Sequence, residues 1–225
     1  MKKRVAVILL VFLAAFTSFA GNYPLKKVLI LVEDNYNLNS KATGEGRQLA
    51  QLMGHFNTSV DIKGTNSYKS QDVNRYDYLF YVGFSPEFQP PAVLCRDVIS
   101  TSKPIIWINS GFKELCKREN IEKKFGFTVV SYDKTSAFDE VRTKDFTFTK
   151  GSPAINRVLI KDKKNVEVWA TATSTSTKTE SPYMVKSGNL IYVADLPFSD
   201  AVVSSRYIYF ADKLHDILNE PHAEM

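Results

Sequence analysis

Polar side chains that could bind or transform a ligand gather in this sequence at the points where apolar runs stop. The stretch LIYVADLPFSD, residues 190–200, is an apolar segment that ends abruptly in a carboxylate and a Pro-containing turn. Three earlier apolar runs end in the same way. The side chains at these four ends are mainly carboxylates, amides and hydroxyls: Glu33, Asp34, Asn35, Ser85, Glu87, Asn109, Ser110 and Asp195. Because ligands bind beyond the carboxyl ends of the strands in open α/β sheets, we predict a cleft for a hydroxyl-rich ligand here.

The same residues also have a purely structural interpretation. Helix starts and loops next to strand ends need polar side chains to satisfy backbone N–H groups, whether or not a ligand is present. A position beyond a strand marks a place for a ligand and does not identify one. Both interpretations stay open at the level of the sequence.

These polar positions depend on an alternation of strands and helices. Continuous apolar runs predict strands at residues 27–32 (KVLILV), 60–62, 77–83 and 104–108. Helical spacing, together with Pro and Gly at the ends, predicts helices at residues 46–56, 92–100 and 112–125. A strand followed by a helix, repeated along the chain, predicts an α/β fold with a doubly wound, mostly parallel sheet.

The second half of the chain has a different pattern. Short β-type runs without long helices between them predict antiparallel strands at residues 127–131, 146–149, 158–160 and 166–170. Two further runs, 183–186 and 189–194, are joined by Ser187-Gly188, which predicts a hairpin. The polar stretch TATSTSTKTES, residues 171–181, predicts a mobile loop, and residues 206–218 predict a last amphipathic helix. We expect one domain over residues 21–220 and a short tail over 221–225.

The first 20 residues are typical of a cleaved export signal. A basic start is followed by 12 apolar residues, 5–16, and by small residues at Ser18 and Ala20. Twelve apolar residues fall short of the roughly 20 that span a bilayer. We therefore expect a secreted or periplasmic protein that keeps no stable membrane anchor after cleavage.

The charge of the chain argues against a nucleic-acid partner. Three of the 29 Lys and Arg residues lie in the signal, so the mature chain has 26 against 24 Asp and Glu. No cluster of Lys and Arg alternates with aromatic residues, as a nucleic-acid surface would require. We expect no nucleic acid among the partners.

Several segments occur in an order that resembles a known family. They are VLILVED, LMGHF, RYDYLFYVGF, KPIIWINSGF, KFGF, SGNLIYVADLPFS and RYIYFADKLHDIL, within residues 26–218. This order resembles the amino-terminal region of secreted, uncharacterised polysaccharide-deacetylase-like bacterial proteins, most specifically in YVADLPFS and RYIYFADKLHDIL. The resemblance implies a flavodoxin-like or class I amidotransferase-like module with additional antiparallel strands. It also implies an accessory or binding role, with a cell-envelope carbohydrate or another envelope protein as partner. The family's catalytic Asp and paired His belong to a deacetylase barrel that follows this region and is not within these 225 residues.

The amidotransferase-like pattern predicts where a catalytic pair would lie. Its Cys sits on a tight turn of the form G-x-C-x-G, and Asn109 takes that position here. Its His and Glu lie in a His-Pro-Glu turn, where this chain has Leu196 and Phe198. Nucleophilic catalysis needs a base within hydrogen-bond reach of the nucleophile, so we expect a non-catalytic module.

An alternative hypothesis is a small hydrolase that uses Ser110 as its nucleophile. Ser110 follows a predicted strand and precedes a predicted helix, but the flanking G-x-S-x-G is absent. Its base would have to be Asp195, Glu33 or Asp34. The sequence leaves this alternative open.

The few His and Cys residues predict no metal site and no cofactor. His215 and His222 are seven positions apart across a predicted helix end, and the chain has no C-x-x-C. Cys95 and Cys116 lie on predicted helices that flank the strand at residues 104–108, which makes them a disulfide candidate. The alternative is two buried thiols that pack as small apolar groups.

Overall fold

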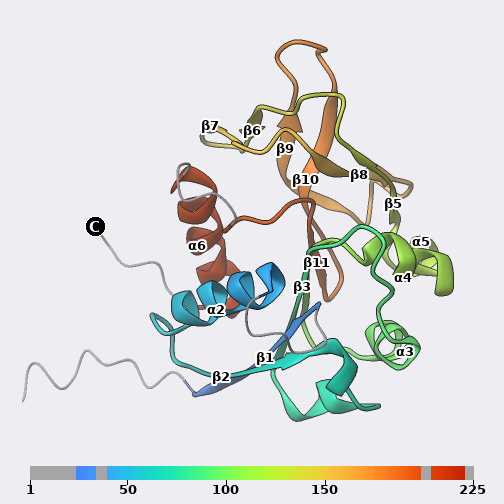
Figure 1. Cartoon of the computed structure of the whole chain (residues 1–225), viewed down its shortest axis with the longest axis vertical. Coiled ribbons are helices and arrows are strands. Elements are labelled where there is room, and N and C mark those ends of the chain that lie inside the picture. Colours follow the sequence, from blue (N-terminus) through green and yellow to red (C-terminus); the bar gives the residue numbers. More distant parts are fainter. Residues whose placement is uncertain (1–23, 34–39, 199–203, 221–225) are drawn as a thin grey trace, which may run out of the picture.

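A nine-stranded mixed sheet forms the centre of the molecule, with strand order β2-β1-β3-β4-β11-β10-β9-β6-β7 (Figure 1). The computed structural model describes residues 24–33, 40–198 and 204–220. The expected export signal, Asp34, Asn35, His222 and the carboxyl-terminal tail lie outside the described residues.

Five neighbouring strands of the sheet are parallel, as the alternation of strands and helices predicts. Four of them are almost completely buried because helices cover both faces of this half of the sheet. Their carboxyl ends lie at one edge of the molecule. The strands are β1 (Lys26–Val32), β2 (Thr58–Gly64), β3 (Tyr78–Gly83), β4 (Ile105–Asn109) and β11 (Leu190–Val193).

Four antiparallel strands extend the sheet beyond β11, and a separate two-stranded sheet lies beside them (Figure 1). The extension consists of β10 (Glu180–Ser187), β9 (Glu167–Thr173), β6 (Glu140–Arg142) and β7 (Thr147–Thr149). The small sheet pairs β5 (Phe127–Asp133) with β8 (Ile155–Ile160). Antiparallel strands and the hairpin at Ser187-Gly188 are confirmed, whereas β6 was not predicted.

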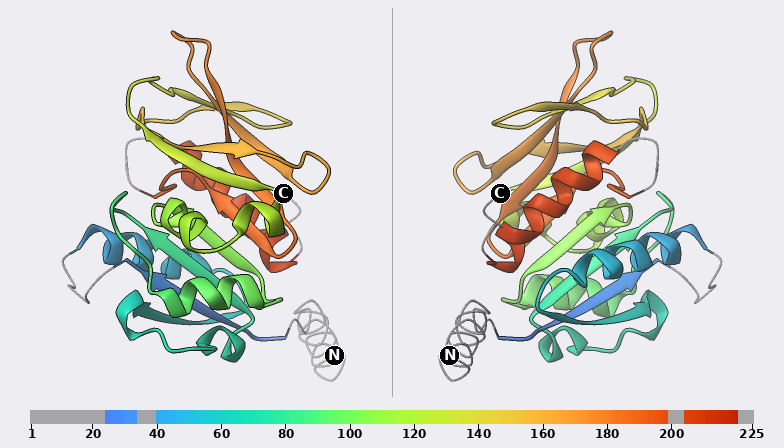
Figure 2. Two further views of the ribbon diagram at one scale, coloured as in Figure 1. Left: turned by 90° about the vertical axis from the view of Figure 1, so that its right-hand side faces the viewer. Right: turned by 90° about the vertical axis from the view of Figure 1, so that its left-hand side faces the viewer.

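The helices lie on both faces of the parallel half. Figure 2 shows α2 (Lys41–Met53) and α6 (Ser204–Leu218) on one face. The other face is covered by α3 (Ala92–Ser100), α4 (Phe112–Arg118) and α5 (Ile121–Phe125). Two short 3₁₀ turns, Thr65–Ser67 and Asp72–Arg75, lead from β2 to β3. No helix among the described residues is long and apolar enough to cross a membrane.

Two predictions of local structure were wrong in their bounds or number of helices, and a third was correct only in part. The expected helix over residues 112–125 is two helices, because Asn120 accepts a hydrogen bond from the Lys123 N–H and starts α5. The expected loop at residues 171–181 is present over residues 174–179 but is shorter than predicted: residues 171–173 belong to β9 and residues 180–181 to β10, since β-branched Thr suits a strand. The first helix begins at Lys41 and not at Gly46, because Ser40 caps it through the Thr43 N–H.

Candidate ligand-binding cleft

A cleft of about 1190 Å³ lies over the carboxyl ends of β3, β4 and β11. The ends of the parallel strands, α2 and α4 supply one part of its lining, and β5, β8 and the loops beside them supply the other. The cleft therefore forms only after the second half of the chain has folded against the parallel sheet. Its lining residues include Lys41, Glu45, Phe84, Glu87, Asn109, Lys113, Tyr132, Lys134, Asn156, Asp195 and Leu196.

Asn109 lies on the floor of this cleft, at the sharp turn between β4 and α4. Its φ of 65° is in the left-handed region, which Asn tolerates better than most residues. This strand-turn-helix geometry is the one that presents a nucleophile in hydrolases of α/β fold. Here the position holds a carboxamide, which cannot serve as that nucleophile.

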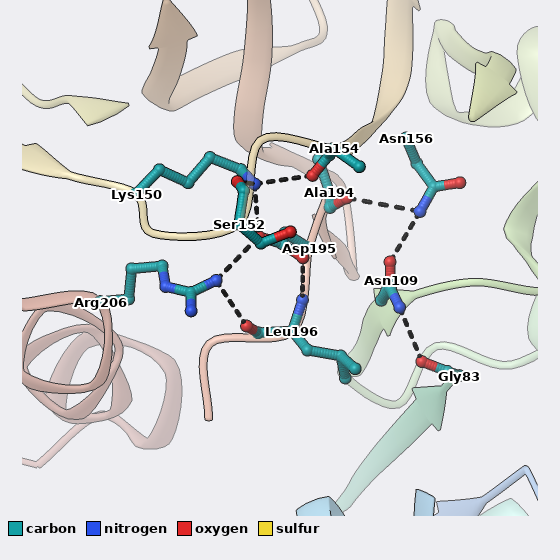
Figure 3. Close-up of polar contacts among 10 residues, drawn as sticks. All are labelled: Gly83, Asn109, Lys150, Ser152, Ala154, Asn156, Ala194, Asp195, Leu196 and Arg206. Carbon is teal, nitrogen blue, oxygen red and sulfur yellow. Dashed lines mark hydrogen bonds and ion pairs between the residues drawn. The ribbon is translucent and has the colours of Figure 1, made fainter. Parts of the chain in front are cut away.

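The Asn109 side chain is held by two hydrogen bonds (Figure 3). Its Nδ2 donates to the Gly83 carbonyl at 3.0 Å, and its Oδ1 accepts from Asn156 Nδ2 at 2.7 Å. The hydroxyl of Tyr192 donates to the Asn109 backbone oxygen at 2.9 Å. The side chain is therefore fixed in place from β3 and from β8.

Ser110 does not have the surroundings of a nucleophile. Its hydroxyl donates to the Phe84 carbonyl at 3.4 Å, and the residue is 2% exposed. No described carboxylate or imidazole is in hydrogen-bond contact with this hydroxyl. Glu33 is held elsewhere, since its two oxygens accept from the backbone N–H groups of Phe84 and Ser85 at 2.8 Å each.

Asp195 is the centre of a buried ionic network (Figure 3). Arg206 contacts one of its oxygens at 2.9 Å and Lys150 contacts the same oxygen at 2.7 Å. The other oxygen accepts from the Leu196 N–H at 2.8 Å. The side chains of Lys150 and Arg206 are fully buried.

Lys150 has three acceptors around its ammonium group. Besides Asp195, it donates to the carbonyl of Ala154 at 2.6 Å and to the carbonyl of Ser152. Burial lowers the pKa of Lys150, and the charge of Asp195 opposes that effect. Because three acceptors surround it, we treat Lys150 as a cation, so Asp195 contacts two cations in the described part of the chain.

Glu45 brings a second buried carboxyl group to the cleft, from the first half of α2. The residue is 7% exposed, and its Oε2 has no hydrogen-bond partner in the described part of the chain. Burial raises the pKa of Glu45 to about 7; Arg206 acts against this and Asp195 adds to it. Both the protonated and the ionised form of Glu45 are therefore populated near neutral pH.

Exposed aromatic and basic side chains line the walls of the cleft. Phe84 and Tyr132 are 39% and 38% exposed. Lys41 lies over the Phe84 ring at 5.4 Å from its centre, and Lys134 lies over the Tyr132 ring at 5.3 Å. Such contacts fix each aromatic ring at the cleft without burying it.

The predicted site residues divide into two groups. Glu87, Asn109 and Asp195 line the cleft, whereas Glu33, Ser85 and Ser110 are not part of its lining. Asp195 is paired with Arg206. Sequence reasoning missed Glu45, Lys150 and Asn156.

Cys95 and Cys116, the disulfide candidate, are both free thiols in this structure. Cys95 Sγ contacts the Pro90 carbonyl at 3.8 Å, while Cys116 forms a hydrogen bond with Thr128. Burial raises the pKa of Cys95 to about 11 and also raises that of Cys116. Each thiol thus packs in its own helix environment, in keeping with the second interpretation.

No group of three or more His, Cys, Asp or Glu among the described residues could hold a metal ion. His215 packs its ring edge-on against Phe56 at 4.9 Å, and neither His55 nor His215 lines the cleft.

The sequence matches no protein-family model, and no curated protein matches it. Solved structures match at low identity. A protein described as ThuA-like, from Bacteroides uniformis, aligns with a TM-score of 0.58 and 14% identity over 87% of this chain and 94% of its own. A glutamine amidotransferase from Thermotoga maritima aligns with a TM-score of 0.53 and 10% identity over 88% and 86%.

A third match, from Thermoplasma acidophilum, is described as part of a GMP synthase. It has a TM-score of 0.56 and 11% identity, and the alignment covers 88% of this chain and 100% of its own. At sequence identities of 10–14%, structural similarity shows that the fold is shared and nothing more. The chain is an α/β module of the class I glutamine amidotransferase-like fold, with additional antiparallel strands in its second half.

Proposed function

We propose that this chain is a non-catalytic binding module whose cleft holds a hydroxyl-rich ligand, specifically a cell-envelope carbohydrate. The observation that carries the proposal is Asn109. It occupies a nucleophile-type turn on the floor of a large cleft, yet its carboxamide is held by hydrogen bonds from two strands. A fixed amide at this point can bind a hydroxyl and cannot attack a carbonyl.

The walls of the cleft suit a sugar. Sugar rings present an apolar face that packs on exposed aromatic rings, which Phe84 and Tyr132 supply. Their hydroxyls pair with amides and carboxyl groups such as Asn109, Asn156 and Glu45. A cleft that combines a few polar groups with aromatic rings is the usual form of a small-ligand site.

The residues at the position expected for a catalytic base give a second argument against turnover. Leu196 lies where the amidotransferase-like pattern has its His, and Phe198 where it has its Glu. Leu196 is 4% and Phe198 is 6% exposed, so both pack in the core. Neither side chain can accept or donate a proton.

Export and a relation to polysaccharide-deacetylase-like proteins complete the proposal. The basic and apolar start of the chain supports export, with a mature protein that begins at Gly21. Mass spectrometry of the exported protein tests this, since an intact Met1 would contradict it. The resemblance of the segments YVADLPFS and RYIYFADKLHDIL to secreted polysaccharide-deacetylase-like proteins supports an accessory role beside a carbohydrate-active enzyme.

The direct test of binding is a glycan array followed by calorimetry with the glycans that bind. We expect Phe84→Ala and Tyr132→Ala each to weaken binding about tenfold, the cost of one buried aromatic contact. Phe146→Ala is the matched control, because Phe146 is 48% exposed and does not line the cleft. Unchanged affinity in both cleft variants, or no glycan that binds, would contradict the proposal.

A further inference from the structure

A second groove lies between α6 and the outer strands of the antiparallel extension (Figure 1). The turn between β6 and β7, the start of β9, the end of β10 and the second half of α6 line it. Its volume is about 460 Å³, within the range of roughly 300–1,000 Å³ that is usual for small-molecule sites. The groove shares no lining residue with the cleft, so it is a separate feature of the molecule.

Trp169 is brought into this groove by a β-bulge in β9. Ala170 pairs with Met184, and Val168 pairs with Val185. Trp169 is therefore an extra residue without a partner in β10. Neighbouring side chains of a regular strand point to opposite faces, yet Val168 and Trp169 both line the groove. The bulge accounts for this departure from the regular pattern.

Contacts from α6 and β10 hold Trp169 in place. The Tyr209 hydroxyl donates to the Trp169 carbonyl at 3.2 Å, so the bulged backbone has a partner on α6. The ammonium groups of Lys186 and Lys213 lie 5.4 and 5.9 Å from the centre of the Trp169 ring. Both distances are near the outer limit of about 6 Å for such contacts, so the lysines orient the ring without capping it closely. Trp169 stays half-buried.

Phe146 supplies a second aromatic ring, from the turn between β6 and β7. Thr143 Oγ1 accepts hydrogen bonds from the N–H groups of Asp145 and Phe146 at 3.2 and 3.0 Å, which fixes this turn. The Phe146 ring packs edge-on against Tyr209, with 6.0 Å between the ring centres. Phe146 nevertheless remains 48% exposed. The groove therefore presents two partly exposed rings whose positions are set by the fold.

The charged side chains of the groove are close to balance. Three lysines and four carboxylates line it. Lys213 contacts Asp216 at 2.7 Å and Asp212 at 3.6 Å. The ammonium groups beside Trp169 would repel an added cation, and the four carboxylates would repel an added anion. A neutral ligand meets neither repulsion, and its hydroxyls can donate to the carboxylates and accept from the lysines.

We propose that this groove is a second carbohydrate site, for a neutral sugar whose apolar face packs on Trp169 and Phe146 and whose hydroxyls pair with the charged groups around them. The inference goes beyond the proposed function, because it concerns a different site built from different residues. A chain with both sites binds two sugar segments. No covalent bond is made or broken at the groove.

Calorimetry with chito-oligosaccharides and cello-oligosaccharides tests the inference. We expect two binding events per chain, one at each site. Trp169→Ala and Phe146→Ala should each weaken one event about tenfold and leave the other unchanged. Phe146→Ala therefore still serves as a control for the affinity of the cleft. Tyr207→Ala is the aromatic control for the groove, because Tyr207 is 36% exposed on α6 and lines neither site.

Fluorescence measures occupancy of the groove in the wild-type protein. The chain has two Trp residues, and Trp107 is fully buried. Quenching by acrylamide in the folded protein therefore reports mainly on Trp169, and saturating oligosaccharide should reduce it. Trp169→Phe keeps an aromatic ring, so it should retain most of the affinity that Trp169→Ala loses.

The outcomes separate this inference from the proposed function. A single binding event that Tyr132→Ala weakens and Trp169→Ala does not, without protection of Trp169 from quenching, would overturn the second site and leave the cleft intact. Binding that only Trp169→Ala and Phe146→Ala weaken would support the second site and contradict the function proposed for the cleft. A groove that prefers uronic-acid oligosaccharides to neutral ones would overturn the inference of a neutral sugar. Failure of every glycan to bind would overturn both proposals.

Discussion

The side-chain amide of Asn156 donates a 2.7 Å hydrogen bond to the side-chain oxygen of Asn109, which lies 47 positions earlier in the chain. Asn109 ends a strand of the parallel sheet, whereas Asn156 belongs to the small sheet formed by β5 and β8. Asn156 Nδ2 also lies 3.4 Å from the Ala194 carbonyl, at the end of β11. This contact joins the two halves of the molecule at the floor of the cleft.

Replacement of Asn109 separates its backbone role from its side-chain role. Asn109→Ala removes two buried hydrogen bonds and places Ala at positive φ, so we expect a loss of about 2–3 kcal/mol in the free energy of unfolding. Asn109→Gly removes the same bonds without the conformational penalty, so it should lose about 1–2 kcal/mol. Urea unfolding measures both; equal losses would contradict a contribution from the backbone.

Gly83 permits the close approach of β3 to the turn after β4. A methyl group at this position would overlap the backbone of Ser110, so Gly83→Ala should destabilise the protein by about 3 kcal/mol. Gly44→Ala is the control, because nothing lies within 4 Å of the added methyl group in α2. We expect that change to stabilise the protein by about 0.5–1 kcal/mol, and thermal unfolding of the two variants tests the contrast.

The ionic network around Asp195 predicts unequal costs for its members. Asp195→Asn removes the carboxylate charge that two buried cations contact and should cost about 3–5 kcal/mol. Lys150→Met leaves Asp195 paired with Arg206 and should cost less. The double variant should lose less stability than the two single losses added together, because the residues are in contact. Additive losses in denaturant unfolding would show that the network does not act as a unit.

Glu45 makes stability depend on pH in a direction opposite to that of ion-paired carboxylates. Burial raises its pKa from 4.5 to about 7, so the folded protein binds a proton that the unfolded chain releases between these values. Stability from this group is complete below pH 4.5 and is lost as the pH rises through 7. A shift of this size corresponds to about 3 kcal/mol, and we expect about 1–2 kcal/mol because the group borders an open cleft. Glu45→Gln should therefore equal the wild type at pH 4.5 and exceed it in stability at pH 8, and the reverse order would contradict a raised pKa.

The part of the fold that the sequence predicts best is the parallel sheet. Runs such as residues 27–32 are apolar throughout because both faces are covered, and this pattern has few alternatives. The strand residues at the two ends of the segment 171–181 were missed because its Thr and Ser residues form a polar run typical of loops. Residues 171–173 are in a strand because they pair with β6, which is a contact between distant segments.

The residues of the cleft also divide into those that the sequence predicts and those that it does not. Asn109 and Asp195 follow apolar strands and could be found from the sequence. Lys150 and Asn156 reach the cleft only through the folding of the second half of the chain, which no local pattern reveals. Glu45 did carry a signal, because it precedes Leu49 by four positions on the buried face of α2. That signal was lost when the helix was predicted to begin at Gly46.

The measurement that tests the central claim most directly follows binding and turnover in one sample. The purified protein is titrated with a glycan that binds on the array, and the recovered glycan is then analysed by mass spectrometry. Parallel incubations contain glutamine, aryl esters and acetylated chito-oligosaccharides. We predict saturable binding that Tyr132→Ala weakens, and every compound recovered unchanged. Turnover of any of them that disappears in Ser110→Ala would contradict a non-catalytic binding module and establish a hydrolase.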